Sequence, residues 1–289
     1  SDEITVFRDG TWVATEKAAN MNRDKLISLM VGRELDQLFP KVEAEIGEVI
    51  LEVEGLNRGR MVKNVSFSVR RGEILGFAGL MGSGRSEVLE TVFGIYPAES
   101  GTIRVKGKTL KIREPHQAIE AGLGLLTEDR KKTGIMGVLS VRDNMSIAAI
   151  NNFSIAGVLR RGQIEKECEA QRQALALKTP SLNQLIQNLS GGNQQKVVLA
   201  REMSRPHSVL LVSQPTRGVD VGSIEFIHDR IIHERDKEGA AIILISTELD
   251  EVTALADRIA VMYRGRVVGI VDAKTSRETL GRMMAGVAK

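Results

Sequence analysis

Residues 79–86, with the sequence GLMGSGRS, have the residue types and spacing of a loop that binds phosphate. They fit the pattern G-x-x-x-x-G-K-[ST], except that Arg85 stands in the place of the lysine. Glycines let the backbone curl until successive N–H groups face an anion, and the positive end of the following helix dipole points to the same place. We therefore predict a phosphate site, with the Ser86 hydroxyl as a ligand of Mg²⁺, formed by Gly79, Gly82, Ser83, Gly84, Arg85, Ser86 and Glu87.

The arginine at position 85 changes what this loop can do with a chain of phosphates. A guanidinium keeps the charge of lysine but replaces a compact ammonium with a wide planar fork. It should still bind phosphate, but it should not place one donor between the β and γ groups as lysine does. The alternative is a glycine-rich turn between a strand and a helix that binds no ligand.

A second glycine-rich segment, LSGGNQQK at residues 189–196, opens another expected helix. Ser190 is a natural N-cap, and the two glycines after it let backbone amides approach an anion. We predict that this segment contacts a phosphate through Leu189, Ser190, Gly191, Gly192, Asn193 and Gln194.

Strands and helices alternate along the chain around these two segments. Strands are expected at residues 49–56, 65–69, 123–128, 208–213, 240–246 and 258–263, and helices at 115–122, 223–238 and 248–257. Alternation at this spacing indicates a mainly parallel sheet with helices on both faces. The predicted fold class is α/β, with a mainly parallel sheet, a small antiparallel β part and an inserted helical lobe at about residues 128–205.

The composition of the 289 residues is that of a globular protein that works in water, with 42% hydrophobic and 27% charged residues. The net charge is only +3 and aromatic residues make up 3%, so a nucleic-acid partner is not expected. The single cysteine, Cys168, rules out an internal disulfide framework and favours a reducing compartment.

An internal repeat relates the two ends of the chain. Residues 4–32 and 259–286 both read as strand, glycine turn, strand, polar loop and amphipathic helix, and Gly10 matches Gly265. A repeat at this spacing has the size of a domain. We therefore predict the tail of a preceding domain at 1–33, a linker at 34–48, the main domain at 49–272 and a C-terminal helix at 273–289. The alternative is two unrelated hairpin–helix segments.

Together, the two glycine-rich motifs resemble those of ABC-transporter ATPases, over nearly the whole chain. The resemblance is closest to the two-domain ATPases of bacterial monosaccharide importers of the ribose, galactose and xylose type. The second domain of that branch also has an arginine in the phosphate loop. It has motifs similar to TEDRKK at residues 127–132, LSGGNQQK at 189–196 and PTRGVDVG at 215–222 of this chain. A nucleoside importer, which shares QPTRG and IEFIH, is an alternative; others are a non-transport ABC protein and an interaction module that has lost nucleotide binding.

The resemblance implies a P-loop NTPase core that takes ATP and Mg²⁺ as cofactors. It implies that the chain is the C-terminal half of an importer's ATPase, peripheral to the cytoplasmic face of the bacterial inner membrane, and that the full protein couples ATP hydrolysis to sugar uptake. The implied partners are its own N-terminal ATPase domain or a second copy, a transmembrane permease dimer and, indirectly, a sugar-binding receptor.

The resemblance also locates catalytic positions that depart from the usual residues. Where such ATPases have an Asp that holds Mg²⁺ through water and a Glu that polarises the attacking water, this chain has Ser213 and Gln214. The switch histidine corresponds to Thr247, and the glutamine between core and helical lobe to Glu128. We therefore expect weak or absent hydrolysis at this site. The alternatives are a polar strand end for the first pair, an N-cap for Thr247 and a solvated loop charge for Glu128.

In this family two domains pair head to tail, so that the phosphate loop of one faces the signature motif of the other. The resemblance therefore implies that residues 190–192 contact the γ-phosphate of ATP held by the preceding domain. Residues 79–87 would form a second, degenerate site. Adenine usually stacks on an aromatic side chain near the position of residues 58–60, where this chain has none, so either an arginine stacks instead or the base is loosely held. The alternative is that these are ordinary loop arginines.

Overall fold

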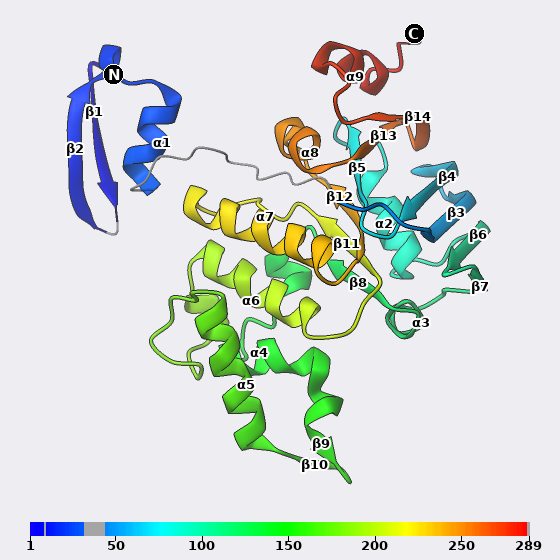
Figure 1. Ribbon diagram of the computed structural model, residues 1–289, viewed down its shortest axis with the longest axis horizontal. Helices are drawn as coiled ribbons and strands as arrows, with labels where there is room; N and C mark the ends of the chain where they lie inside the picture. Colours follow the sequence, from blue (N-terminus) through cyan, green and yellow to red (C-terminus); the bar gives the residue numbers. More distant parts are fainter. Residues whose placement is uncertain (9, 32–43, 288–289) are drawn as a thin grey trace.

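The computed structural model describes residues 1–8, 10–31 and 44–287. A six-stranded sheet in the order β14-β13-β5-β12-β11-β8 forms the centre of the main body (Figure 1). Its strands run parallel except for β14, which is antiparallel to β13 at one edge. The strands are β5 (Ile74–Gly79), β8 (Leu123–Leu126), β11 (Val209–Ser213), β12 (Ala241–Ile245), β13 (Arg258–Tyr263) and β14 (Arg266–Asp272).

The central strands β11 and β12 have the sequences VLLVS and AIILI, and every residue in them is buried. Such continuous apolar runs are typical of parallel strands covered on both faces. One face packs against α2 (Arg85–Phe93), α3 (Pro115–Glu120) and the second sheet. The other packs against α6 (Gly191–Met203), α7 (Val221–Asp236), α8 (Leu249–Leu255) and α9 (Arg277–Met284).

The second sheet is antiparallel and has the strand order β4-β3-β6-β7. Its strands are β3 (Val49–Arg58), β4 (Val62–Arg70), β6 (Ser100–Val105) and β7 (Lys108–Leu110). The turn between β3 and β4 reaches the loop that follows β5, which brings this sheet to the edge of the predicted phosphate site.

A helical lobe is inserted between β8 and β11 and has a hydrophobic core of its own. It begins with a π-type turn (Arg130–Gly134) and ends with α6, which joins it to the sheet (Figure 1). Between them lie α4 (Val141–Ser146), a 3-10 segment (Ile147–Phe153), the short strands β9 (Ser154–Ile155) and β10 (Val158–Leu159), α5 (Arg161–Ala174) and a second 3-10 turn (Ile186–Asn188). These observations confirm the predicted fold class.

The N-terminal part of the chain forms a separate hairpin and helix, drawn beside the main body in Figure 1. It consists of β1 (Glu3–Arg8), β2 (Thr11–Lys17), a 3-10 turn (Ala18–Asn20) and α1 (Arg23–Val31). This is the element order of β13, β14 and α9, as the sequence repeat indicates. The predicted linker falls largely on residues 32–43, which lie outside the described residues.

Buried histidine–carboxylate pairs connect α7 to its neighbours. Nε2 of His228, on α7, lies 2.6 Å from Oε1 of Glu251 on α8. Nε2 of His207, just before β11, lies 3.3 Å from Oε2 of Glu234 near the end of α7. The first pair fixes the helix that follows Thr247, so it helps to set the position of that residue.

No helix in the described ranges is both long enough and apolar enough to span a bilayer.

Candidate functional site

The predicted phosphate loop lies between the end of β5 at Gly79 and the start of α2 at Arg85. Gly82 and Gly84 have positive φ angles of 76° and 101°. A Cβ on Gly84 would lie 2.1 Å from the carbonyl oxygen of Met61, in the turn between β3 and β4, so only glycine fits there. The loop therefore needs its glycines both for its conformation and for its contact with the second sheet.

The backbone N–H groups at the start of α2 are available to a ligand. The first bond of the helix runs from the Val88 N–H to the Gly84 carbonyl, at 3.1 Å. Within the described residues, no backbone hydrogen bond is donated by residues 84–87. A helix leaves its first amides without an intrahelical acceptor, and such amides together with the helix dipole favour an anion.

Arg85 is turned inward rather than toward solvent. Its side chain is buried, and Nη1 donates a hydrogen bond of 2.8 Å to the Ser246 carbonyl oxygen, just beyond β12. Burial lowers the pKa of the guanidinium, although the carboxylates of Glu128 and Glu87 oppose that shift. Arg85 thus links the phosphate loop to the strand tip that precedes Thr247, and its contact with phosphate stays a prediction.

The carboxylate of Glu128 bridges the phosphate loop and the turn after β11. Ser86 Oγ donates to Glu128 Oε2 at 2.5 Å, and Arg217 Nη1 donates to Glu128 Oε1 at 3.2 Å. A hydroxyl and a carboxylate oxygen side by side are hard ligands of the kind that Mg²⁺ prefers. The residues present therefore fit a Mg²⁺ ion held at Ser86.

The two polar residues at the end of β11 have no acidic character and differ in their contacts. Ser213 is buried, and its hydroxyl has no hydrogen-bond partner among the described residues. Gln214 adopts a positive φ of 52°, and its Oε1 accepts bonds from the backbone N–H (3.1 Å) and the hydroxyl (3.2 Å) of Thr247. The tips of β11 and β12 are therefore connected through an amide.

The expectation that Thr247 caps α8 is wrong. The N-cap of that helix is Glu248, and no side chain bonds to the free amides of its first turn. The Thr247 hydroxyl is used by Gln214 instead. A tertiary hydrogen bond has replaced the local one because the neighbouring strand tip supplies an acceptor.

The signature segment begins α6 as the sequence indicates. Ser190 is the N-cap, and its Oγ accepts from the Asn193 backbone N–H at 3.5 Å and from Asn193 Nδ2 at 2.9 Å. Ser190 is exposed, whereas Gln194 is buried and its Nε2 donates to carbonyl oxygens of residues 186, 187 and 189. Ser190 can thus meet a ligand from another molecule, while Gln194 holds the preceding turn. Leu189 is half-buried.

Both glycines of the signature segment are required by close packing. A Cβ on Gly191 would lie 2.6 Å from the Gly218 carbonyl oxygen, and one on Gly192 would lie 2.3 Å from Ser223 Oγ. The start of α6 therefore rests directly on the turn and helix that follow β11.

The sequence profile of the ABC transporter family matches residues 62–217, from β4 through both glycine-rich segments to the turn after β11. This chain belongs to the ABC transporter family.

Two curated relatives are named as ribose/galactose/methyl galactoside import ATP-binding proteins. One, from Halalkalibacterium halodurans, is 47% identical over 290 residues, which covers 100% of this chain and 55% of the relative. The other, from Pseudomonas syringae pv. tomato, is 48% identical over 287 residues, which covers 99% of this chain and 54% of the relative. The chain thus spans about half the length of the curated relatives it matches.

Solved structures of ABC cassettes share the fold. An ATP-binding cassette of an ABC transporter has a TM-score of 0.69 at 20% identity, covering 83% of this chain and 98% of that one. A dimeric ATP-binding cassette bound to ADP and Pi has a TM-score of 0.66 at 18% identity, covering 78% and 100%. At these identities the similarity shows the fold alone.

Two arginines of this ABC domain, Arg130 and Arg217, lie in the motifs TEDRKK and PTRGVDVG, but no role was predicted for either of them. Arg130 Nη1 donates to Gln195 Oε1 (3.3 Å) and to the carbonyl oxygen of Arg217 (3.5 Å). Burial lowers the pKa of Arg130. Contacts therefore run from Ser86 through Glu128, Arg217 and Arg130 to the start of α6. The charged motif TEDRKK indicated the family in the sequence. Its contacts could not be predicted, because the residues that Arg130 bonds to are far away along the chain.

Stacking of an arginine on adenine stays a prediction, and Arg58 already stacks on a ring of this chain. The guanidinium of Arg58 lies over the ring of Tyr96, 3.8 Å from its centroid. Arg60 is exposed in the turn that touches the phosphate loop.

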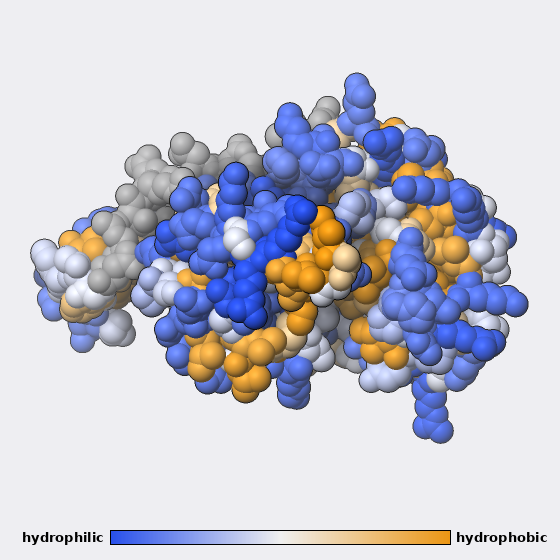
Figure 2. All heavy atoms as spheres, turned by 90° about the horizontal axis from the view of Figure 1, so that it is seen from below, coloured by the Kyte–Doolittle hydropathy of each residue, from blue (hydrophilic) through white to orange (hydrophobic). Residues whose placement is uncertain are grey.

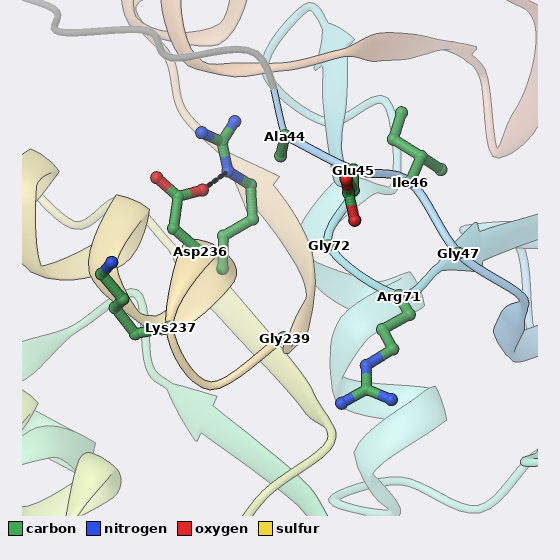
Figure 3. A pocket seen from close by; sticks show the side chains of 10 residues that line it. Ala44, Glu45, Ile46, Gly47, Arg71, Gly72, Asp236, Lys237 and Gly239 are labelled. Atoms are coloured by element: carbon green, nitrogen blue, oxygen red, sulfur yellow. Dashed lines mark hydrogen bonds and ion pairs between the residues drawn. The ribbon is translucent and has the colours of Figure 1, made fainter.

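A separate cavity of about 690 Å³ lies away from these residues (Figure 3). Gly72 and Gly239 line it, and they precede β5 and β12, so it lies at the opposite end of the sheet from the phosphate loop. Charged side chains surround it, including Arg71 and the Arg235–Asp236 pair, whose Nε and Oδ1 are 2.6 Å apart. None of the predicted site residues lines this cavity.

Proposed function

We propose that this chain is the C-terminal ATP-binding half of a two-domain ABC importer for a monosaccharide, peripheral to the cytoplasmic face of the bacterial inner membrane. The observation that carries the proposal is the match of the whole chain, at 47% identity, to about half of a protein named for ribose/galactose/methyl galactoside import. The sugar itself is selected by other subunits, the permease and its receptor, because this chain contributes the nucleotide sites.

The N-terminal hairpin supports the proposal that residues 1–33 end a preceding ATPase domain. The pairing of β1 with β2 shifts register between Val6 and Phe7, and that of β13 with β14 shifts between Val261 and Met262, at the equivalent place in the repeat. The two hairpins therefore share one pairing irregularity at matching positions, which supports an equivalent role in two domains.

The equivalent side chains differ sharply in burial. Phe7 is 61% exposed and its cross-strand partner Trp12 is 60% exposed, whereas Met262 is fully buried in the core of the main domain. Met262 is covered because β13 pairs with β5 in the six-stranded sheet. By the same logic, β1 belongs beside a strand of a preceding domain, with residues 34–48 as linker, 49–272 as the second domain and 273–289 as its C-terminal helix.

In the proposed cassette, residues 79–87 bind the phosphates of ATP with Mg²⁺ at Ser86. Hydrolysis there is weak because Ser213 carries no charge for the metal and Gln214 is not a base near neutral pH. The exposed Ser190 and the glycines after it contact the γ-phosphate of ATP held by the preceding domain or by a second copy. A permease dimer and, through it, a sugar receptor complete the assembly, which involves no nucleic acid.

The test compares ATP hydrolysis by three proteins: this 289-residue chain, the full two-domain protein, and the full protein with Ser190→Arg. We expect slow turnover by the chain alone, faster turnover by the full protein, and loss of that gain in the variant. Brisk hydrolysis by the chain alone would contradict the proposal. Binding of a fluorescent ATP analogue to the chain separates a degenerate nucleotide site from an interaction module that binds none.

A further inference from the structure

A short hairpin at the far end of the helical lobe exposes several large apolar side chains (Figure 1). We call residues 154–159, which comprise β9, β10 and the turn between them, the tip hairpin. Ile155, Val158 and Leu159 are 54%, 69% and 45% exposed, and Ile147, at the start of the 3-10 segment that precedes the hairpin, is 41% exposed. Such a group of exposed aliphatic side chains marks an interaction site more often than scattered single residues do.

The base of the tip hairpin is fixed, so its apolar side chains are presented by a defined structure. The Arg160 backbone N–H donates to the Phe153 carbonyl oxygen at 2.9 Å, and Phe153 is buried in the lobe core. Ala156 and Gly157 have φ angles of 48° and 79°, the geometry of a tight hairpin turn.

The residues next to the tip hairpin in the sequence carry positive charge and no negative charge. Arg160 and Arg161 follow it directly and are exposed, and residues 144–164 contain no acidic side chain. The next carboxylate along the chain, Glu165, is paired with Arg142 Nη1 at 3.2 Å. A partner with negative charge beside an apolar region would therefore complement this surface.

The shape of the surface favours one kind of partner. The hairpin projects from the far end of the lobe (Figure 1), and the face seen from below carries hydrophobic patches among hydrophilic side chains (Figure 2). A projecting apolar turn has no groove to receive a helix, but it can enter the boundary between headgroups and acyl chains of a bilayer, where basic residues meet anionic lipids. We infer that the tip hairpin inserts into an anionic lipid surface. This inference does not depend on the nucleotide sites.

The chain offers a matched control hairpin between β6 and β7. Its turn residues Lys106 and Gly107 have φ angles of 50° and 74°, the same geometry as the tip hairpin. Its surroundings are basic, with Lys108 and Lys111, but the turn presents no large aliphatic side chain. It therefore separates insertion of apolar side chains from simple attraction of positive charge.

The experiment places an environment-sensitive fluorophore at either turn, through Ala156→Cys or Lys106→Cys in the 289-residue chain. The native Cys168 should not react, because burial and then neighbouring carboxylates raise its pKa to about 12. Vesicles of phosphatidylglycerol and phosphatidylethanolamine are compared with vesicles of phosphatidylcholine. We expect a blue shift for the label at 156 on the anionic vesicles and no shift for the label at 106.

Two further variants measure the apolar and the charged contributions. In Ile155→Ser with Val158→Ser, the vesicle partition coefficient should fall at least tenfold with an unchanged melting temperature, because both side chains are exposed. In Arg160→Gln with Arg161→Gln it should fall about fivefold for each arginine. No shift at 156, equal shifts at both turns, or unaltered binding by the serine variant overturns the inference. So does a shift at 156 that requires an added permease, because the partner would then be protein.

Discussion

Replacing Glu128 with glutamine tests how the negative charge of this carboxylate affects nucleotide binding at the proposed degenerate site. The carboxylate is shared between Ser86 and Arg217, at 2.5 Å and 3.2 Å. Arg217 is 64% exposed at its side chain, so the ion pair should contribute less than about 1 kcal/mol to stability. Glu128→Gln should therefore fold normally, and its effect should appear in nucleotide binding.

The expected effect has opposite signs with and without Mg²⁺. Without the metal, the carboxylate should repel a triphosphate bound by the loop amides. For two unit charges about 6 Å apart and an effective dielectric constant near 20, Coulomb's law gives a repulsion on the order of 3 kcal/mol, which solvent exposure reduces. In the proposed site, a bound Mg²⁺ would have the same carboxylate as a ligand beside the Ser86 hydroxyl. We therefore expect Glu128→Gln to tighten metal-free ATP about tenfold and to weaken Mg·ATP about tenfold, each about 1.4 kcal/mol.

The assay is titration of a fluorescent ATP analogue in EDTA and in excess Mg²⁺, with wild type and two variants. Asp129→Asn is the matched control, because the neighbouring carboxylate accepts from the Lys132 backbone N–H at 3.1 Å and does not bond to Ser86. It should leave both affinities within about twofold. Equal shifts of the same sign in EDTA and Mg²⁺, or no shift in either, would refute the role assigned to Glu128.

Three further predictions follow from burial, backbone geometry and titration. Gly84→Ala should abolish binding of the ATP analogue because its Cβ has no room, whereas Gly82→Ala, with nothing within 4 Å of its added carbon, should retain it at a cost of about 1 kcal/mol in unfolding free energy. Met262→Ala should lower the unfolding free energy of this chain, measured in urea, by about 2–5 kcal/mol, because Met262 is fully buried. Phe7→Ala should cost under about 0.5 kcal/mol in the same 289-residue chain, where Phe7 is exposed. In the full-length protein the same change should cost about 3–5 kcal/mol. Burial lowers the pKa of His207, but hydrogen bonds and nearby carboxylates outweigh burial and raise the pKa overall. The stabilising contribution of His207 is therefore complete below about pH 6.5, the unfolded value, and is lost as the pH rises through the folded pKa. His207→Gln should flatten that part of the curve of unfolding free energy against pH.

The two glycine-rich segments could be predicted from sequence because their geometry is local. Positive φ angles at Gly82 and Gly84 and the N-cap at Ser190 depend on residues within a few positions of each other. The alternating apolar strands likewise predicted a parallel sheet with helices on both faces, because each strand is buried as a unit. These features account for most of the fold and for the position of the phosphate loop.

The contacts between the segments could not be predicted, because they join residues far apart in the chain. Nothing near Glu128 in sequence indicates that it meets Ser86, and nothing near Thr247 indicates that Gln214 takes its hydroxyl. The N-cap expected at Thr247 failed for this reason, since a local propensity of about 1 kcal/mol yields to a tertiary partner of similar strength. The stacking of Arg58 on Tyr96 belongs to the same class.

These long-range contacts give the proposed degenerate site a role other than hydrolysis, although Arg85 replaces the lysine of its phosphate loop. Glu128 joins Ser86 to Arg217, and the Arg217 carbonyl accepts from Arg130, which also bonds to Gln195 on the signature helix. If Glu128 became a ligand of a metal at Ser86, its bond to Arg217 would change, at the turn on which α6 rests. In the proposed pair of domains, nucleotide bound at residues 79–87 would then affect the position of the signature segment, which contacts the ATP of the partner domain. Binding without hydrolysis would be sufficient for that role, so the proposal expects the uncharged residues at positions 213 and 214 to abolish hydrolysis and to leave nucleotide binding in place.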